Sequence, residues 1–87
     1  MKADHAKAKR QLSIAKGQLE GIMRMVDEDA YCIDVSNQIL ATIALLKKLN
    51  VTILSAHLEA CVASSKSEAE IKEKVKELEQ TLSRMGD

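Results

Sequence analysis

Three side chains in this sequence could bind a metal ion or react with an oxidant: both cysteines, Cys32 and Cys61, and one of the two histidines, His57. Their spacing is C-x24-H-x3-C. Because His57 and Cys61 are four residues apart, a helix would place them on one face, where they can chelate one ion. Two thiolates and one imidazole suit Cu(I) in a trigonal site, whereas Zn(II) would need a fourth ligand.

A plainer interpretation of these residues is also available. Both cysteines could be small buried side chains, and His57 a histidine satisfied within a core. The other histidine, His5, stands in a polar N-terminal turn, where it could be a fourth ligand, although a solvated side chain is the simpler explanation. In a reducing compartment, two cysteines favour metal-binding or oxidant-sensing thiols over a structural disulfide.

The distance between the ligands is the main constraint on how the chain must fold. If one helix runs through residues 31–63, its rise of about 1.5 Å per residue puts Cys32 roughly 37 Å from His57. One straight helix therefore cannot gather the three ligands. Either the helix folds back, or Cys32 of one subunit meets His57 and Cys61 of another. Two long helices packed antiparallel would create two equivalent sites per dimer.

The composition predicts an all-α single domain over residues 1–87. The chain has no Pro, Phe or Trp and only three Gly, which is typical of long helices. We expect a short, a long and a short helix at about 4–26, 31–63 and 67–85. We place Asp29 at the N-cap of the second helix, and Ser67 with Glu70 in a capping box before the third. Apolar seams mark the outer two helices, at Ala8, Leu12, Ala15, Leu19, Ile22 and Val26, and at Ile71, Val75, Leu78, Leu82 and Met85.

The long helix is apolar around most of its circumference, so it must be surrounded. Two companion helices of about 20 residues cannot cover it, and an 87-residue domain buries only a thin core. We therefore expect a second subunit to cover it.

Several classes of protein are disfavoured. The N-terminus is too polar for a signal peptide and no apolar run approaches the roughly 20 residues of a membrane span, so we expect a cytoplasmic protein without a membrane partner. A glycine-rich phosphate loop, a carboxylate pair and an activated nucleophile are all missing from the sequence, which argues against an enzyme or a small-molecule substrate. The net charge is zero, but residues 1–26 carry six basic and two acidic side chains.

Three segments resemble the copper-sensitive operon repressor (CsoR) family: GQLEGIMRMV at 17–26, DAYCIDV at 29–35 and HLEAC at 57–61. The similarity runs from about residue 8 to 82. It implies three-helix subunits in antiparallel four-helix-bundle dimers, paired into homotetramers, that bind operator DNA without a helix-turn-helix. It also implies that about one Cu(I) per subunit, held by Cys32, His57 and Cys61 across the dimer interface, releases the DNA. Tyr31 and Glu73 align with outer-shell residues of copper-binding members, Glu73 only across a gap.

A repressor of this kind depends on phosphate contacts. The candidates for these contacts are Lys9, Arg10, Lys16 and Arg24 in the first helix, and Lys47 and Lys48 in the second. Gln11 is a departure, because family members usually carry arginine at that place. Arg10 is next to it but points about 100° away around the helix.

Two other functions remain open from the sequence. The chain could be a thiol- or persulfide-responsive repressor of the same fold, in which Cys32 and Cys61 of facing subunits become joined. It could also be a copper-binding protein without operator binding, as Gln11 and the zero net charge would allow. The resemblance also separates branches of the family. Nickel and cobalt sensors show His-x3-His at the places that match 57 and 61, and persulfide sensors lack the histidine. His57 with Cys61 therefore favours copper.

Overall fold

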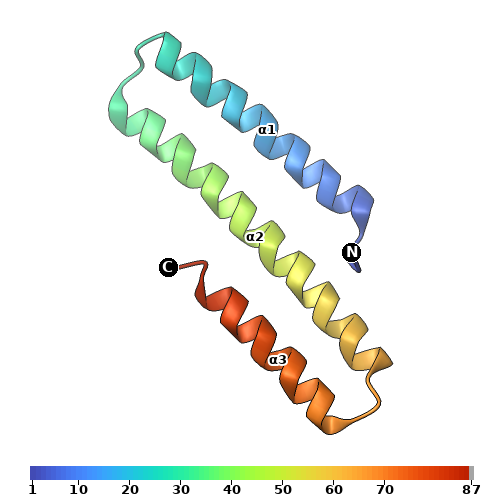
Figure 1. The fold of residues 1–87 in the computed structure, drawn as a ribbon. Coiled ribbons are helices and arrows are strands. Elements are labelled where there is room, and N and C mark those ends of the chain that lie inside the picture. Colours follow the sequence, from blue (N-terminus) through green and yellow to red (C-terminus); the bar gives the residue numbers. More distant parts are fainter. Residues whose placement is uncertain (87) are drawn as a thin grey trace.

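The computed structural model describes residues 1–86 and contains three helices: α1 (His5–Asp27), α2 (Cys32–Ser64) and α3 (Glu68–Ser83) (Figure 1). No strand occurs in this range, so the all-α prediction is confirmed. Each predicted helix starts one residue before the observed one, at the residue that forms the N-cap. The third helix ends at Ser83, whereas the prediction extended it to 85.

Side chains cap the starts of α1 and α3. The Asp4 carboxylate accepts a hydrogen bond from the Lys7 N–H at 3.2 Å, and the Ser67 hydroxyl accepts one from the Glu70 N–H at 3.1 Å. Ser67 is therefore the N-cap that was predicted. The Glu70 carboxylate accepts from the N–H of Lys66 at 3.3 Å. The box is thus closed one residue earlier than in the usual reciprocal pattern.

The prediction that Asp29 caps the start of α2 is wrong. Asp29 has a φ of 57°, in the left-handed region, and the N-cap of α2 is Tyr31, whose side chain makes no capping hydrogen bond. The Asp29 N–H bonds to the carbonyl of Val26 at 3.1 Å, and the Ala30 N–H to that of Met25 at 2.9 Å. This pair of bonds is a Schellman motif, and aspartate tolerates its left-handed position better than most residues. Asp29 therefore closes α1.

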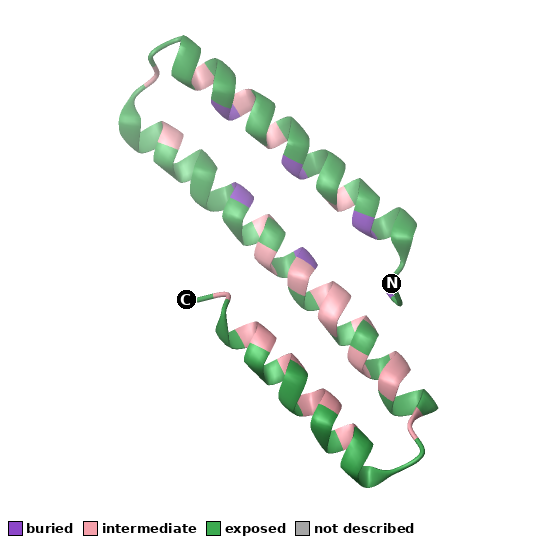
Figure 2. Cartoon of the chain, viewed as in Figure 1, coloured by how far each residue is buried: buried purple, intermediate pink, exposed green. Residues whose placement is uncertain are grey.

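The three helices form a layer that is one helix thick. The helices α1 and α3 lie on opposite sides of α2, each antiparallel to it, and the Cα positions extend over 57 × 27 × 11 Å (Figure 1). The buried apolar residues of the described chain are few and line the α1 and α2 surfaces that face each other (Figure 2): Ala3, Ala8, Ala15, Ile22 and Leu49. A layer of this kind cannot enclose a core by itself.

The predicted seam of α1 is correct for only half of its residues. Ala8, Ala15 and Ile22 are buried against α2, but Leu12 and Leu19 are about half exposed and belong to a second apolar stripe. Gln11 and Gln18, both half-buried, take their place beside α2. The helix thus has two apolar sides, of which only one packs within the chain.

Much of the apolar surface of α2 remains exposed. Seven of its large apolar side chains are at least 40% exposed: Ile33, Ile39, Leu40, Ile43, Leu46, Val51 and Val62. The cause is length, since α2 has 33 residues and α3 has 16, so α3 leaves the N-terminal half of α2 uncovered on its side.

Contrary to the prediction about membrane spans, α2 is long and apolar enough to cross a membrane by length and composition alone. The core helix of a soluble protein can pass the same test. Lys47 and Lys48 lie at the midpoint of α2. In a bilayer they would sit near the centre, where each lysine costs about 2.5–3.5 kcal/mol. These two charges argue against a bilayer around α2.

Candidate metal centre

His57 and Cys61 lie together near the C-terminal end of α2. The Cys61 Sγ is 3.6 Å from the His57 Nε2, the contact expected for residues four apart on one helical face. His57 is exposed and Cys61 is half-buried. The pair therefore presents an imidazole nitrogen and a sulfur to one point outside the helix, as a bidentate ligand does.

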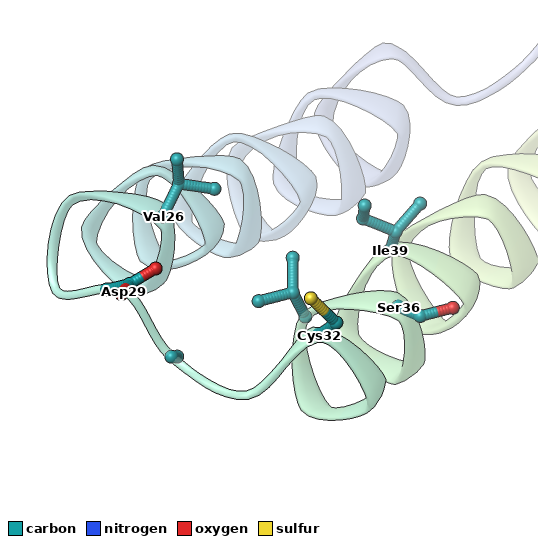
Figure 3. A pocket seen from close by; sticks show the side chains of 7 residues that line it. Val26, Asp29, Cys32, Ser36 and Ile39 are labelled. Atoms are coloured by element: carbon teal, nitrogen blue, oxygen red, sulfur yellow. The ribbon is translucent and has the colours of Figure 1, made fainter.

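Cys32 is the first residue of α2 and lies at the opposite end of that helix. Its side chain is exposed and borders a groove of about 330 Å³ (Figure 3). The groove is mostly apolar and lies where the end of α1 meets the start of α2, lined by Val26, Asp29, Ala30, Cys32, Val35, Ser36 and Ile39. The Cys32 thiol is thus accessible there, and among the described residues it does not belong to a group of three possible metal ligands.

A single chain does not assemble the three ligands. Within residues 1–86, no three cysteine, histidine or acidic side chains come together in a way that could hold a metal ion. Because α2 runs unbroken from Cys32 to Ser64, it does not fold back to join them. About 37 Å of helix separates Cys32 from His57. Residues 1–86 of one chain therefore do not bring these three side chains to a single ion. The donor set fits Cu(I), since it offers two soft sulfurs and one imidazole.

Tyr31 and Glu73 do not contact His57 within the described part of one chain. Tyr31 is 69% exposed and directly precedes Cys32. Glu73 lies on the outer side of α3, in a shallow groove with Lys76, Glu77 and Gln80. The half-buried side chains of α3 include Ile71, Val75, Leu78 and Leu82. Tyr31 lies at the other end of α2 from His57, so it could reach a His57 only from a second subunit.

The six basic candidates do not share one surface. Lys9 and Lys16 form one row on α1, about 100° around the helix from the buried Ala8 and Ala15, and Arg10 and Arg24 form a second row roughly 100° further around. We call these four residues the basic edge, and all four are exposed. On α2, Lys48 is exposed, while Lys47 is half-buried in a groove with Met85 of the α3 end. The structure thus separates Lys47 from the basic edge.

Gln11 faces the seam between α1 and α2. It is half-buried and borders a cavity of about 10 Å³ whose other walls include Leu49, Thr52 and Ile53. Its Oε1 is shielded from solvent and has no hydrogen-bond partner among the described residues. Position 11 therefore belongs to the packing of α1 on α2, and its side chain does not extend the basic edge.

Replacing Gln11 with methionine should stabilise the protein. The change keeps the length of the side chain and removes a shielded acceptor, whose desolvation costs about 1–3 kcal/mol. We expect the free energy of unfolding to rise by about 1 kcal/mol, measured by urea denaturation. The matched control is Gln80→Met on the exposed side of α3, which should change stability by less than about 0.5 kcal/mol. A less stable Gln11→Met variant would mean that the Oε1 has a partner in solution.

Sequence reasoning missed one residue, Thr42. Its hydroxyl donates a hydrogen bond to the Gln18 Oε1 at 2.7 Å and so joins the middle of α2 to α1. The signal was a single polar residue within the apolar run from Ile39 to Ala44.

Comparison with known proteins shows which proteins resemble this chain in sequence and in structure. The family model of metal-sensitive transcriptional repressors matches residues 4–84. The copper-sensing transcriptional repressor CsoR of Mycobacterium ulcerans is 41% identical over 58 residues, which cover 67% of this chain and 50% of that protein. The copper-sensing repressor RicR of Mycobacterium tuberculosis is 41% identical over 59 residues, 68% of this chain and 62% of that one. The chain thus spans about half to two thirds of the length of these relatives. The solved structure of the nickel-responsive transcriptional regulator InrS matches with a TM-score of 0.78 and 27% identity, over 98% of this chain and 96% of that one.

Proposed function

This chain belongs to the family of metal-sensitive transcriptional repressors, and from that membership we propose that it is a Cu(I)-responsive repressor. It binds operator DNA without the metal and releases it when Cu(I) binds to Cys32, His57 and Cys61 between two subunits. One observation carries this proposal: the His57 and Cys61 pair lies at one end of a straight helix whose other end begins with Cys32. Members of the family are regulators rather than enzymes.

Copper is favoured by the chemistry of the donors. Cu(I) accepts three soft ligands in a trigonal site, which two thiolates and one imidazole supply. Several relatives are named as copper sensors, whereas the similar solved structure is named as nickel-responsive. Ni(II) is therefore the second candidate, although it prefers tetragonal nitrogen-rich sites, which one histidine does not complete. When bound, Cu(I) would supply bonds that hold two subunits together.

The dimer is proposed to form by antiparallel packing of two α2 helices. This packing covers the apolar face that carries Ile39, Ile43 and Leu46, and it brings Cys32 of each subunit to His57 and Cys61 of the other. The point midway between Cys32 and the His57 and Cys61 pair lies at about residue 46, so Leu46 should meet its own copy near the two-fold axis. Two such dimers would form the tetramer that the family resemblance implies.

Tyr31 and Glu73 are proposed as outer-shell residues of this site. Tyr31 adjoins Cys32, so it would approach the His57 of the partner subunit. Met85, at the end of α3, lies beside Lys47 and Asn50. Twelve residues back along the antiparallel α3, roughly 18 Å away, Glu73 is level with His57 and Cys61. The His57 Nε2 faces Cys61, which leaves Nδ1 for a phenol or carboxylate that would fix the ring orientation.

The experiment that tests the function is a gel shift with the DNA upstream of the gene for this protein. We expect binding at low salt by the metal-free reduced protein and release with about one Cu(I) per subunit. The affinity should fall steeply with salt, because the basic edge displaces counterions. Ni(II) and an organic polysulfide are the comparison arms, and release by either one alone would identify the inducer as nickel or sulfur. Failure to bind the DNA at low salt would refute the repressor function.

A charge-matched pair of variants tests the basic edge in the same assay. Lys9→Gln with Lys16→Gln removes two charges from α1, and Lys72→Gln with Lys76→Gln removes two exposed charges from α3. We expect the first pair to weaken DNA binding at least tenfold and the second pair by less than about threefold. Equal effects of the two pairs would remove the basic edge from the DNA interface.

A further inference from the structure

Thr42 stands out in the seam between α1 and α2. It is 4% exposed, and no other polar side chain of the described residues belongs to a buried residue. The other buried residues of the two facing helices are apolar, among them Ala15 on α1 and Leu49 on α2. A polar group in such surroundings must be hydrogen-bonded, or its burial is costly.

The hydroxyl of Thr42 has two acceptors within reach but only one hydrogen. It lies 2.7 Å from the Oε1 of Gln18 and 3.1 Å from the carbonyl oxygen of Gln38, one turn back in its own helix. Back-bonding to a carbonyl four residues earlier satisfies the hydroxyl without Gln18. The bond to Gln18 can therefore break without leaving Thr42 unpaired, and the link between the helices has two low-cost states.

The link also lies between the two functional ends of the proposed repressor. Thr42 is ten residues, or roughly 15 Å, along α2 from Cys32. Gln18 stands on α1 between Lys16 and Arg24 of the basic edge. Binding of the α2 ends to a partner subunit would shift α2. That shift would be transmitted to α1 and its basic edge through the seam between the two helices, where this bond fixes the position of α1 on α2.

We propose that the bond from Thr42 to Gln18 couples metal occupancy to DNA affinity, and that Thr42 is a positioning residue which touches neither ligand nor DNA. The inference rests on the proposed function. Allosteric coupling between two sites has a definite size, the factor by which one ligand changes the affinity for the other. Loss of one neutral hydrogen bond should lower that factor about fivefold.

The test measures operator affinity with and without Cu(I), and Cu(I) affinity separately by competition with a chromophoric chelator. Thr42→Val removes the hydroxyl at constant shape, and Thr42→Ser restores it. Thr52→Val is the matched control, because within residues 1–86 the Thr52 hydroxyl donates only to the carbonyl of Lys48, at 3.1 Å, in its own helix. We expect Thr42→Val to keep the parent's Cu(I) affinity within about twofold while its coupling factor falls about fivefold. Thr42→Ser and Thr52→Val should keep the parent's factor.

Gln18→Met provides an independent measurement from the other side of the bond. It should lower the coupling factor by the same amount, and the double variant should lose no more than either single one. Equal coupling factors for Thr42→Val and Thr52→Val, or additive losses in the double variant, would overturn the inference. A parent protein whose DNA affinity ignores Cu(I) would instead refute the proposed function itself.

Discussion

Mixing Cys32→Ser subunits with Cys61→Ser subunits should restore a Cu(I) site that neither variant forms alone. Each variant dimer lacks the same ligand at both of its sites. In a mixed dimer, one site has Cys32 from the Cys61→Ser chain and His57 with Cys61 from the Cys32→Ser chain, while the other site lacks both thiols. The reason is the length of α2, which holds Cys32 and the His57 and Cys61 pair too far apart for one chain to join them.

The expected amount of metal follows from random pairing. Half of the dimers in an equal mixture are mixed, and each has one complete site, so about one Cu(I) should bind tightly per four subunits. The parent should bind about four times as much. Unfolding the mixture together in denaturant and refolding it anaerobically ensures exchange of subunits, and chelator competition counts the tight sites.

A matched control keeps the same protein concentrations but cannot form a complete site. It mixes Cys32→Ser with the double variant Cys32→Ser, Cys61→Ser, so Cys32 is missing from every dimer. No tight Cu(I) should be recovered in this mixture. Tight binding by either single variant alone would show that the ligand assignment is wrong, and no recovery in the complementing mixture would exclude the shared site.

Leu46→Asp should abolish the dimer and, with it, both Cu(I) and DNA binding. Leu46 is 40% exposed in the single chain and lies on the apolar face of α2 that we expect a second copy to cover. Near a two-fold axis, the substitution brings two carboxylates together inside an interface. A buried charge without a partner costs about 3–5 kcal/mol, which corresponds to a rise of at least about a hundredfold in the dimer dissociation constant. Sedimentation velocity at micromolar concentration measures this directly.

Two further variants give this experiment its specificity. Ala41→Asp places the same charge on an exposed position of α2 that points about 140° away from Leu46, and it should leave the dimer intact. Leu46→Cys should form an intersubunit disulfide on mild oxidation, because only a residue close to the axis meets its own copy. A monomeric Ala41→Asp variant together with a dimeric Leu46→Asp variant would place the interface on the opposite face of the layer.

The helices and the His57 and Cys61 contact could be predicted because both depend on local rules. The absence of Gly and Pro from positions 31–63 predicts a continuous α2, and a spacing of four on a helix fixes the contact. The role of Asp29 could not be decided in this way. An acidic residue before a helix suits an N-cap, yet the same residue type also tolerates the left-handed position that ends a helix. In the structure Asp29 takes the second role, because the backbone N–H groups of Asp29 and Ala30 bond to carbonyls at the end of α1.

The side on which α1 packs was also beyond reach of the sequence. Leu12 and Leu19 are larger than Ala8 and Ala15, so apolar periodicity gives both stripes similar weight. The structure buries the alanines because small side chains let the two helices approach closely, and it leaves the leucines exposed. The rotation of each helix about its own axis decides that Gln11 lies in the seam and that Glu73 points outward. No local sequence pattern specifies that rotation.

The length of α2 has a consequence for how two metal ions in one dimer could influence each other. The two proposed sites would lie at opposite ends of the paired helices, roughly 37 Å apart. Screening in physiological salt acts over about 8 Å, so the charge on one ion is not felt at the other. Any cooperativity must then be mechanical, transmitted as a change in how the two helices cross. A Hill coefficient near one would mean two independent switches on one repressor, whereas a larger value would mean that the first ion prepares the far end of the helix pair for the second.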